Sequence, residues 1–281
     1  MKNHFLLAAL DLDGTLLNSK SSISDTNKKA IKAASDAGTT FVIATGRPYS
    51  GLPLDSMKEL GIQYAITTNG ASVYKVPEKE CLLENCMPWE QTAKLLKELL
   101  SYPIHLDVFI HGTSYTPSIC RNAIENMNHF PPELKDYILS TRTLIPDMID
   151  FLHREKLDVQ KVTMNFPRAE NGTILYRDKT MEILDCYPDI CYLSGGYGNL
   201  EFTKKGISKA NGLAFLCNHL NIPIEQTLAC GDSENDLDIL KAAGLGIAMK
   251  NAPEHVKSKA DEIAPSNEED GVATIIEKYF L

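Results

Sequence analysis

Short apolar runs alternate with helical patterns along the first 83 residues. The runs are almost continuously hydrophobic, as in strands buried on both faces of a parallel sheet, and they lie at 5–10, 39–44 and 64–67. Between them, apolar residues recur at helical spacing over 25–37, and Pro48 and Gly61 suit the start and the end of a second helix. This alternation predicts an α/β fold built on a doubly wound, Rossmann-like parallel sheet.

The pattern changes after residue 83, where prolines and charged residues interrupt the alternation. Later strands are expected at 104–110, 159–166, 190–193, 200–202, 227–230 and 245–249. Later helices are expected at 89–101, 148–154 and 180–185, after Ser208, after Leu237 and from Gly271. The Gly-rich stretch 195–198 lacks the spacing of a dinucleotide-binding loop, and we interpret it as a hinge. We therefore predict a core domain formed by 1–83 and 195–281, with a second α/β domain, 84–194, inserted into it.

Three apolar runs of the predicted core end in residues that carry chemistry. These residues are Asp11 and Asp13 after the first run, Thr45 after the second, and Asp232, Asn235 and Asp236 after the run at 227–230. The carboxyl ends of parallel strands lie along one edge of a sheet, so we expect these side chains to meet there. Crowded carboxylates repel each other unless a cation, a proton or backbone donors offset their charge. The sequence therefore predicts a functional site at this edge.

The acidic residues suit a divalent metal in phosphoryl-transfer chemistry, because a carboxylate nucleophile and a phosphate group repel each other. Mg²⁺ prefers hard oxygen ligands, which Asp11, Asp232 and the main-chain carbonyl of Asp13 could supply. Asp236 could add charge directly or through a water molecule. A Ca²⁺-binding loop is excluded, because Leu237 stands where such a loop needs Gly. A solvated helix cap is the alternative interpretation of residues 232–236.

Candidate phosphate ligands follow from the same topology. Thr45 offers a hydroxyl, and Gly46 and Arg47 offer backbone donors to the transferring oxygens. Lys209 lies in the first turn of a predicted helix, where its ammonium group and the helix dipole favour the same anion. Asn235 could bond a phosphate oxygen or a metal-bound water without adding charge. Taken singly, a threonine that ends a strand and a surface lysine are the more common interpretations of Thr45 and Lys209.

Five motifs together resemble the Cof-type branch (subfamily IIB) of the haloacid dehalogenase superfamily, most of whose members are Mg²⁺-dependent phosphatases. They are DLDGTLL at 11–17, ATGRP at 44–48, TNGA at 68–71, KGISK at 205–209 and GDSEND at 231–236, and the tail SNEEDGV at 266–272 is also similar. The chain departs from that branch at Ala210, where many relatives have Gly, and at Thr203-Lys204, where Pro is frequent.

The resemblance implies a role for each residue that matches these motifs. Asp11 would be the nucleophile and Asp13 the general acid/base. Thr45 and Lys209 would bind phosphate, and Asp232 would bind the metal. The implied reaction is a two-step hydrolysis of small phosphate monoesters through an aspartyl-phosphate on Asp11.

Other functions share parts of this residue set. A phosphohexomutase is one alternative, because a similar insertion occurs in phosphomannomutases. Receiver domains of signalling proteins also gather Asp, Thr and Lys around Mg²⁺, but they are much shorter. A sugar-phosphate-binding module without activity is a third alternative, although every catalytic residue type is present. Sugar phosphates, pyridoxal phosphate and flavin mononucleotide are all candidate substrates.

Substrate specificity is expected to come from the inserted domain. Candidate contacts there are His105, His111, Arg121, His129, His153, Arg154 and Lys161. Each of these taken alone is more often a surface or packing residue. In the core, Asn69 is a candidate contact to the leaving group.

Charge and cysteine content bear on partners and compartment. The net charge of −9 gives no electrostatic footprint for nucleic acid or an anionic membrane, and no run approaches the roughly 20 apolar residues of a membrane span. Met1–His4 and the apolar run after it mimic a secretory signal, but Asp11 and Asp13 interrupt it. Seven cysteines, an odd number, favour reduced thiols and a cytoplasmic location. We expect a small phosphorylated metabolite as the partner, and the oligomeric state is open.

Overall fold

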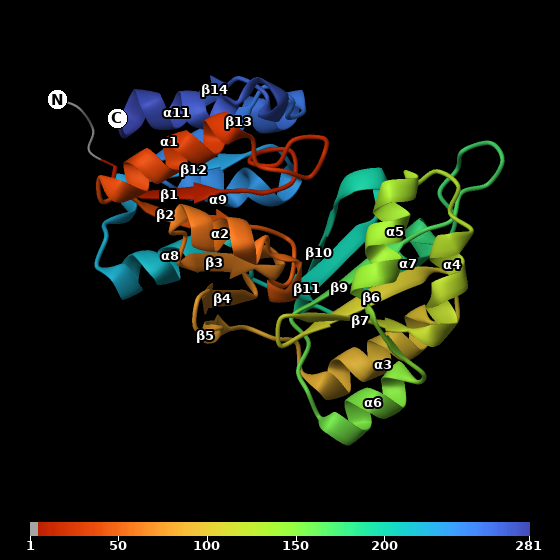
Figure 1. Cartoon of the computed structure of the whole chain (residues 1–281). Helices are drawn as coiled ribbons and strands as arrows, with labels where there is room; N and C mark the ends of the chain where they lie inside the picture. The colour runs from red at the N-terminus through yellow and green to blue at the C-terminus, as the bar shows by residue number, and fades with distance from the viewer. Residues whose placement is uncertain (1–4) are drawn as a thin grey trace. The chain divides into compact units, whose positions relative to one another are not determined.

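The computed structural model describes residues 5–281, so the predicted signal-like start at 1–4 lies outside the described residues. The chain divides into two compact units, of which the second is Asn85–Ile207 and the first combines the chain before it with Ser208–Leu281. Each unit has its own sheet and its own hydrophobic core (Figure 1). Within 5–281, no helix has the length and apolar character needed to cross a bilayer.

An eight-stranded sheet forms the centre of the first unit. Its strands, in spatial order, are β14 (Glu262–Ala264), β13 (Leu245–Met249), β12 (Thr227–Gly231), β1 (Leu7–Leu10), β2 (Thr40–Ala44), β3 (Tyr64–Thr67), β4 (Ser72–Lys75) and β5 (Glu80–Glu84). The strands from β14 to β3 are parallel, and β4 and β5 extend the sheet as an antiparallel edge. The strands at the middle of the sheet are therefore those that the apolar runs predict.

Helices cover both faces of this sheet. They are α1 (Asp25–Asp36), α2 (Leu54–Leu60), α8 (Lys209–Leu220), α9 (Leu237–Ala242), α10 (Glu254–Lys257) and α11 (Gly271–Tyr279). Along β1, Ala8 and Leu10 pack into the cluster that contains residues of α1, α2 and α11, whereas Leu7 and Ala9 pack into the cluster of α8, α9 and α10. This alternation explains why the run is continuously apolar, since both faces of the strand are buried. The predicted doubly wound α/β fold is confirmed.

The start of one helix differs from the prediction. Pro48 precedes only a short 3-10 turn, Tyr49–Gly51, and α2 begins after Pro53 instead. Helix α8 begins directly after Ser208, as predicted, but the Ser208 hydroxyl makes no capping hydrogen bond and donates instead to Oδ1 of Asn211 at 2.8 Å. The predicted end of α2 is confirmed, since Gly61 has a left-handed φ of 72° that favours glycine.

The second unit is built on a six-stranded sheet. Its strands, in spatial order, are β10 (Ile190–Ser194), β11 (Leu200–Lys204), β9 (Lys161–Asn165), β6 (His105–Ile110), β7 (Thr113–Pro117) and β8 (Thr143–Ile145). Its helices are α3 (Trp89–Leu99), α4 (Arg121–Glu125), α5 (Pro132–Thr141), α6 (Met148–Glu155) and α7 (Arg177–Leu184). Leu106 and Val108 of β6 pack with Leu96 of α3 and Leu152 of α6 in the core of this unit.

The predicted boundary at residue 195 is wrong. Strand β11 pairs antiparallel with β10 and with β9, so it belongs to the second sheet, and this unit continues to Ile207. Residues 195–198 connect β10 to β11 within one hairpin, which contradicts their interpretation as a hinge between domains. Glycine serves a turn there, because two antiparallel strands need only a short connection.

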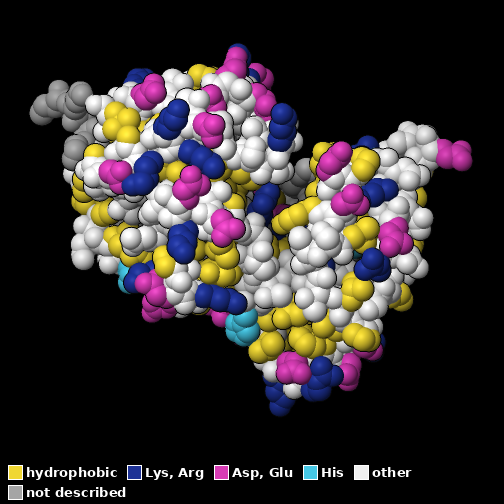
Figure 2. Space-filling model, viewed as in Figure 1, with side chains coloured by type: hydrophobic (Ala, Val, Ile, Leu, Met, Phe, Trp, Pro, Cys, Tyr) yellow, Lys and Arg dark blue, Asp and Glu magenta, His cyan; other side chains and the backbone are white. Residues whose placement is uncertain are grey.

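The surface of the described residues carries charges of both signs. On the face in view, Lys and Arg side chains are interspersed with Asp and Glu side chains rather than gathered by sign (Figure 2). This face therefore presents no extended basic stripe of the kind that follows a phosphate backbone.

Candidate active site

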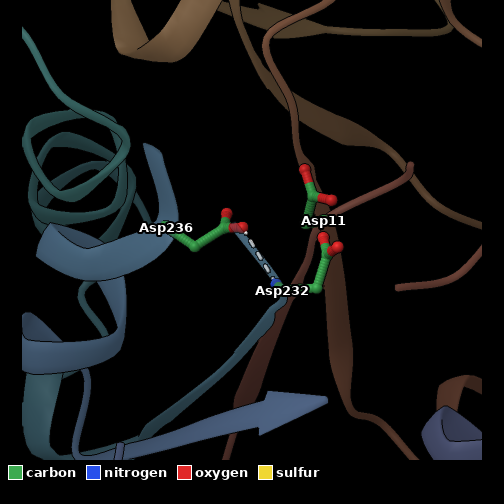
Figure 3. A group of neighbouring side chains, drawn as sticks. All are labelled: Asp11, Asp232 and Asp236. Atoms are coloured by element: carbon green, nitrogen blue, oxygen red, sulfur yellow. Dashed lines mark hydrogen bonds between the residues drawn. The ribbon is translucent and has the colours of Figure 1, made fainter. Parts of the chain in front are cut away.

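Three carboxylates meet at the carboxyl edge of the first sheet. Asp11 follows β1 and Asp232 follows β12, and these strands are neighbours in register, with Leu10 opposite Cys230. Asp236 ends the 3-10 turn Glu234–Asp236 just beyond β12. One oxygen of each carboxylate lies within 4.8 Å of the others, and Figure 3 shows the carboxyl group of Asp236 pointing toward Asp11 and Asp232. The structure thus brings together residues more than 200 positions apart.

Lys209 is the cation at the centre of this cluster. It is the first residue of α8 and is completely buried, and its Nζ lies 2.6 Å from Oδ1 of Asp11 and 2.6 Å from Oδ1 of Asp236. The other oxygen of Asp236 accepts the backbone N–H groups of Asp232 and Ser233, both at 3.0 Å. Asp236 therefore holds Lys209 and the turn after β12 in place with both of its oxygens.

The pKa values of this cluster are shifted by burial first and by the neighbouring charges second. Burial raises the pKa of Asp11 well above its ordinary value, and the charge of Lys209 opposes this while Asp236 and Asp232 add to it. Burial and then Asp236 raise the pKa of Asp232 to about 7, against the opposing charge of Lys209. Burial would lower the pKa of Lys209, but Asp11 and Asp236 raise it. One ammonium group thus faces three carboxylates, which leaves room for a further positive charge.

The donor set fits a hard divalent cation. Three carboxylate side chains gather on two neighbouring strand ends, and oxygen ligands of this kind suit Mg²⁺. A cation among them would oppose the burial and the mutual repulsion that together raise the pKa values of Asp11 and Asp232. The carboxylate of Asp13 is not part of this group of three.

The loop after β1 lies directly against Asp232. Gly14 has a φ of +85°, and a Cβ atom at this position would lie 2.3 Å from Oδ2 of Asp232. A side chain is therefore excluded both by the backbone conformation and by the close approach. Thr15 is buried, and its hydroxyl donates to Oδ1 of Asp232 at 3.4 Å. These contacts with Asp232 explain why glycine and threonine follow the two acids.

Asp13 lies apart from the buried carboxylates and pairs with Arg47. The side chain of Asp13 is 58% exposed, and Nε of Arg47 donates to its Oδ2 at 2.8 Å while Nη2 contacts Oδ1. The guanidinium also donates to the carbonyl of Gly51 at 3.2 Å. This bidentate contact of the Arg47 side chain was not predicted from the sequence, which pointed only to the backbone of Arg47.

Polar residues at the ends of β2 and β3 continue the same edge. Thr45 follows β2 and is buried, and its hydroxyl accepts the N–H of Arg47 at 3.1 Å. Asn69 follows β3 with a φ of 58°, and its Oδ1 accepts Nδ2 of Asn235 at 3.0 Å. The strand order β12, β1, β2, β3 places Asn235, Asp11, Thr45 and Asn69 at successive strand ends. Gly46 lies between Thr45 and Arg47 in the turn after β2.

Sequence reasoning assigned no role to two asparagines that contact this loop. Nδ2 of Asn251 donates to the carbonyl of Gly14 at 2.8 Å, and Nδ2 of Asn267 donates to the carbonyl of Leu17 at 2.9 Å. Side-chain contacts to backbone oxygens leave no periodic pattern in the sequence. The only signal was the similarity of the tail at 266–272 to one family.

The chain matches a known protein family over almost its whole length. Residues 8–276 match the model of the haloacid dehalogenase-like hydrolase family. The phosphatase YwpJ of Bacillus subtilis is 30% identical over 98% of this chain and 99% of its own, and the 5-amino-6-(5-phospho-D-ribitylamino)uracil phosphatase YcsE of the same organism is 31% identical over 98% and 96%.

A solved structure extends the likeness to three dimensions. A haloacid dehalogenase-like hydrolase from B. subtilis superposes with a TM-score of 0.82 at 29% identity, over 97% of this chain and 99% of that one. The family match spans nearly the whole chain, and the five motifs lie within it. The chain therefore belongs to the haloacid dehalogenase superfamily, as a Cof-type phosphatase.

Proposed function

We propose that this phosphatase hydrolyses small phosphate monoesters with Mg²⁺ through an aspartyl-phosphate on Asp11. The observation that carries the proposal is the cluster of Asp11, Asp232 and Asp236 around Lys209 at the carboxyl edge of the sheet. A nucleophilic carboxylate needs nearby positive charge before it can approach a phosphate dianion. Lys209 supplies part of that charge, and the remaining acids form a site for the rest.

The metal would be held at the carboxyl edge of the sheet, where the carboxylates of Asp11, Asp232 and Asp236 lie together. Asp11, Asp232 and the carbonyl of Asp13 would be its ligands, with Asp236 adding charge directly or through water. Mg²⁺, when bound, supplies positive charge between the nucleophile and the phosphate oxygens. Thr45, Gly46 and Asn235 would donate hydrogen bonds to the phosphate oxygens, and Lys209 would add its charge.

The reaction then takes two displacement steps at phosphorus. In the first, an oxygen of Asp11 forms a bond to phosphorus, the bond to the leaving oxygen breaks, and Asp13 gives that oxygen a proton. In the second, Asp13 takes a proton from water, whose oxygen attacks phosphorus and releases phosphate and the carboxylate of Asp11. Arg47 would orient Asp13 for both proton transfers, because its guanidinium contacts both oxygens of that carboxylate.

The substrate class is a small phosphorylated metabolite. One relative is named for a substrate that carries a phosphoribityl chain, which supports including such esters beside sugar phosphates, pyridoxal phosphate and flavin mononucleotide. Among the candidate specificity residues, His105 is buried with Nδ1 3.0 Å from Nδ2 of Asn165, and Arg121 pairs with Glu125 on the surface.

All seven cysteines carry free thiols, which suits a cytoplasmic location.

The test is turnover of p-nitrophenyl phosphate by the purified protein with and without Mg²⁺, in parallel with Asp11→Asn. We expect metal-dependent release of free phosphate that the substitution abolishes. Phosphate release that persists in Asp11→Asn would overturn the assignment of the nucleophile. A screen of phosphorylated metabolites with the same protein would then rank the substrates by kcat/KM.

A further inference from the structure

The catalytic loop after β1 is held by the last third of the chain. Asn251 lies just after β13, and its Nδ2 donates to the carbonyl of Gly14 at 2.8 Å. The same nitrogen lies 3.5 Å from Oδ2 of Asp232, at the limit of a hydrogen bond. A single amide group therefore touches both the loop that carries Asp13 and the carboxylate at the end of β12.

A second layer fixes the orientation of Asn251. The N–H of Asn267 donates to Oδ1 of Asn251 at 3.3 Å, and Nδ2 of Asn267 donates to the carbonyl of Leu17 at 2.9 Å. Because Oδ1 accepts this bond, Nδ2 of Asn251 is left to face Gly14 and Asp232.

The turn that carries Asn267 is itself closed locally. Asn267 begins the 3-10 turn Asn267–Glu269, and both the N–H and the hydroxyl of Ser266 donate to Oε2 of Glu269, at 3.0 and 2.8 Å. Lys250, next to Asn251, contacts Oε1 of the same glutamate at 3.0 Å. The tail motif at 266–272 thus has a structural role, because its closed turn holds the N–H of Asn267 in position to bond Asn251.

We propose that Asn251 is a positioning residue of the metal site, and this inference rests on the proposed function. The carbonyl of Asp13, one of the expected Mg²⁺ ligands, immediately precedes Gly14, whose own carbonyl is bonded by Asn251. Gly14 in turn lies against Asp232, since no Cβ would fit between them. By holding Gly14 and touching Asp232, Asn251 sets the spacing between the ligands on two neighbouring strand ends. Groups that orient metal ligands typically contribute about 10–100-fold to metal affinity or activity.

The experiment measures Mg²⁺ binding to Asn251→Ala by isothermal titration calorimetry without substrate. The control is Asn218→Ala, which removes the same side chain from an exposed position of α8. We expect the Kd for Mg²⁺ to rise about tenfold in Asn251→Ala and to stay at the wild-type value in the control. Asn251 is exposed, so the variant should fold with a melting temperature near that of the wild type.

Activity titrated with Mg²⁺ gives a second readout. The half-saturating Mg²⁺ concentration should rise by the same factor, whereas KM for p-nitrophenyl phosphate changes less than threefold. A Kd for Mg²⁺ within threefold of the wild-type value would overturn the inference, and so would a lowered melting temperature with unchanged affinity. If the wild type hydrolyses esters with Mg²⁺ but Asn251→Ala matches it, only the inference fails. A wild type that binds no Mg²⁺ would overturn the proposed function together with the inference.

Discussion

Both units of the molecule bury an acid beside a cation, but only one of them balances the charge. In the second unit, Nε of Arg142 donates to Oδ2 of Asp107 at 2.9 Å, and the hydroxyl of Thr116 donates to its other oxygen. Burial would raise the pKa of Asp107, yet His105 and Arg142 bring it below its ordinary value. In the first unit, Lys209 faces three acids, and the pKa values of Asp11 and Asp232 are raised.

The difference separates a structural ion pair from a reactive centre. Asp107 has all the positive charge and hydrogen bonds that it needs, so nothing further is required to keep it ionised. Asp11 and Asp232 are buried close to like charges at neighbouring strand ends, at a cost that a proton or a ligand with positive charge would reduce. Perturbed pKa values of opposite direction thus distinguish the two clusters, although both are buried and ionic.

The largest expected effect comes from replacing the nucleophile. Asp11→Asn keeps the shape of the side chain but cannot attack phosphorus, so kcat should fall by at least about a thousandfold. The substitution also removes one of three repelling charges, and Lys209 keeps Asp236 as a partner. The melting temperature without Mg²⁺ should therefore stay level or rise. A melting temperature that falls steeply would mean that the charges at this edge are balanced, as they are around Asp107.

The second unit should respond in the opposite way. Arg142→Met leaves Asp107 buried without its guanidinium partner, and breaking a buried pair from one side costs about 3–5 kcal/mol. We expect a clear fall in the melting temperature of this unit, measured by calorimetry. Arg154→Met is the matched control, because Arg154 is exposed and its partners are too, so its removal should leave the melting curve unchanged. Equal melting curves for the two variants would contradict the structural role of the Asp107–Arg142 pair.

Mg²⁺ should stabilise the protein more at pH 8 than at pH 5.5. Asp232 has a pKa of about 7 in the folded protein against an ordinary value of 3.8, so between about pH 4 and 7 the folded state holds a proton that the unfolded state lacks. Stability of the metal-free protein therefore falls as the pH rises through this window, and protons compete with the metal below pH 7.

The measurement is a thermal melt with and without Mg²⁺ at both pH values. We expect a rise in melting temperature of several degrees at pH 8 and a markedly smaller one at pH 5.5. Asp232→Asn should lose most of the effect of the metal at pH 8. A metal-induced rise that is independent of pH would show that Asp232 does not take part in binding.

The strand ends of the core were predictable from the sequence, whereas the membership of one strand was not. The runs before Asp11 and Asp232 are apolar on both faces, and parallel strands necessarily end at one edge, so their meeting follows from pattern alone. The sequence of β11 is short and compatible with either sheet. Only its pairing with β9 and β10 shows that it belongs to the sheet of the second unit. For this reason the boundary at 195 was misplaced.

Side-chain contacts within the site were predictable only in part. The positions of Asp11, Thr45, Asn69, Asp232, Asn235 and Asp236 at strand ends follow from the sequence. That Lys209 bridges Asp11 and Asp236, or that Asn251 reaches the carbonyl of Gly14, depends on atomic positions that no residue spacing encodes. Such contacts come from packing between elements far apart along the chain.

The smallest expected effect concerns the exposed Asp13, whose function depends on the geometry of its contact with Arg47 as well as on charge. Two nitrogens of Arg47 bind the two carboxylate oxygens of Asp13. A lysine would keep the positive charge but lose this bidentate contact, which fixes the orientation of the carboxylate. Arg47→Lys should therefore lower kcat about tenfold, because the general acid/base is misaligned, with little change in KM or melting temperature. Arg154→Lys, the same exchange at an exposed pair of the second unit, should leave the melting temperature unchanged. A kcat for Arg47→Lys within twofold of the wild type would show that Asp13 needs only a nearby positive charge. The Asp13–Arg47 pair would then be equivalent to an ordinary surface ion pair.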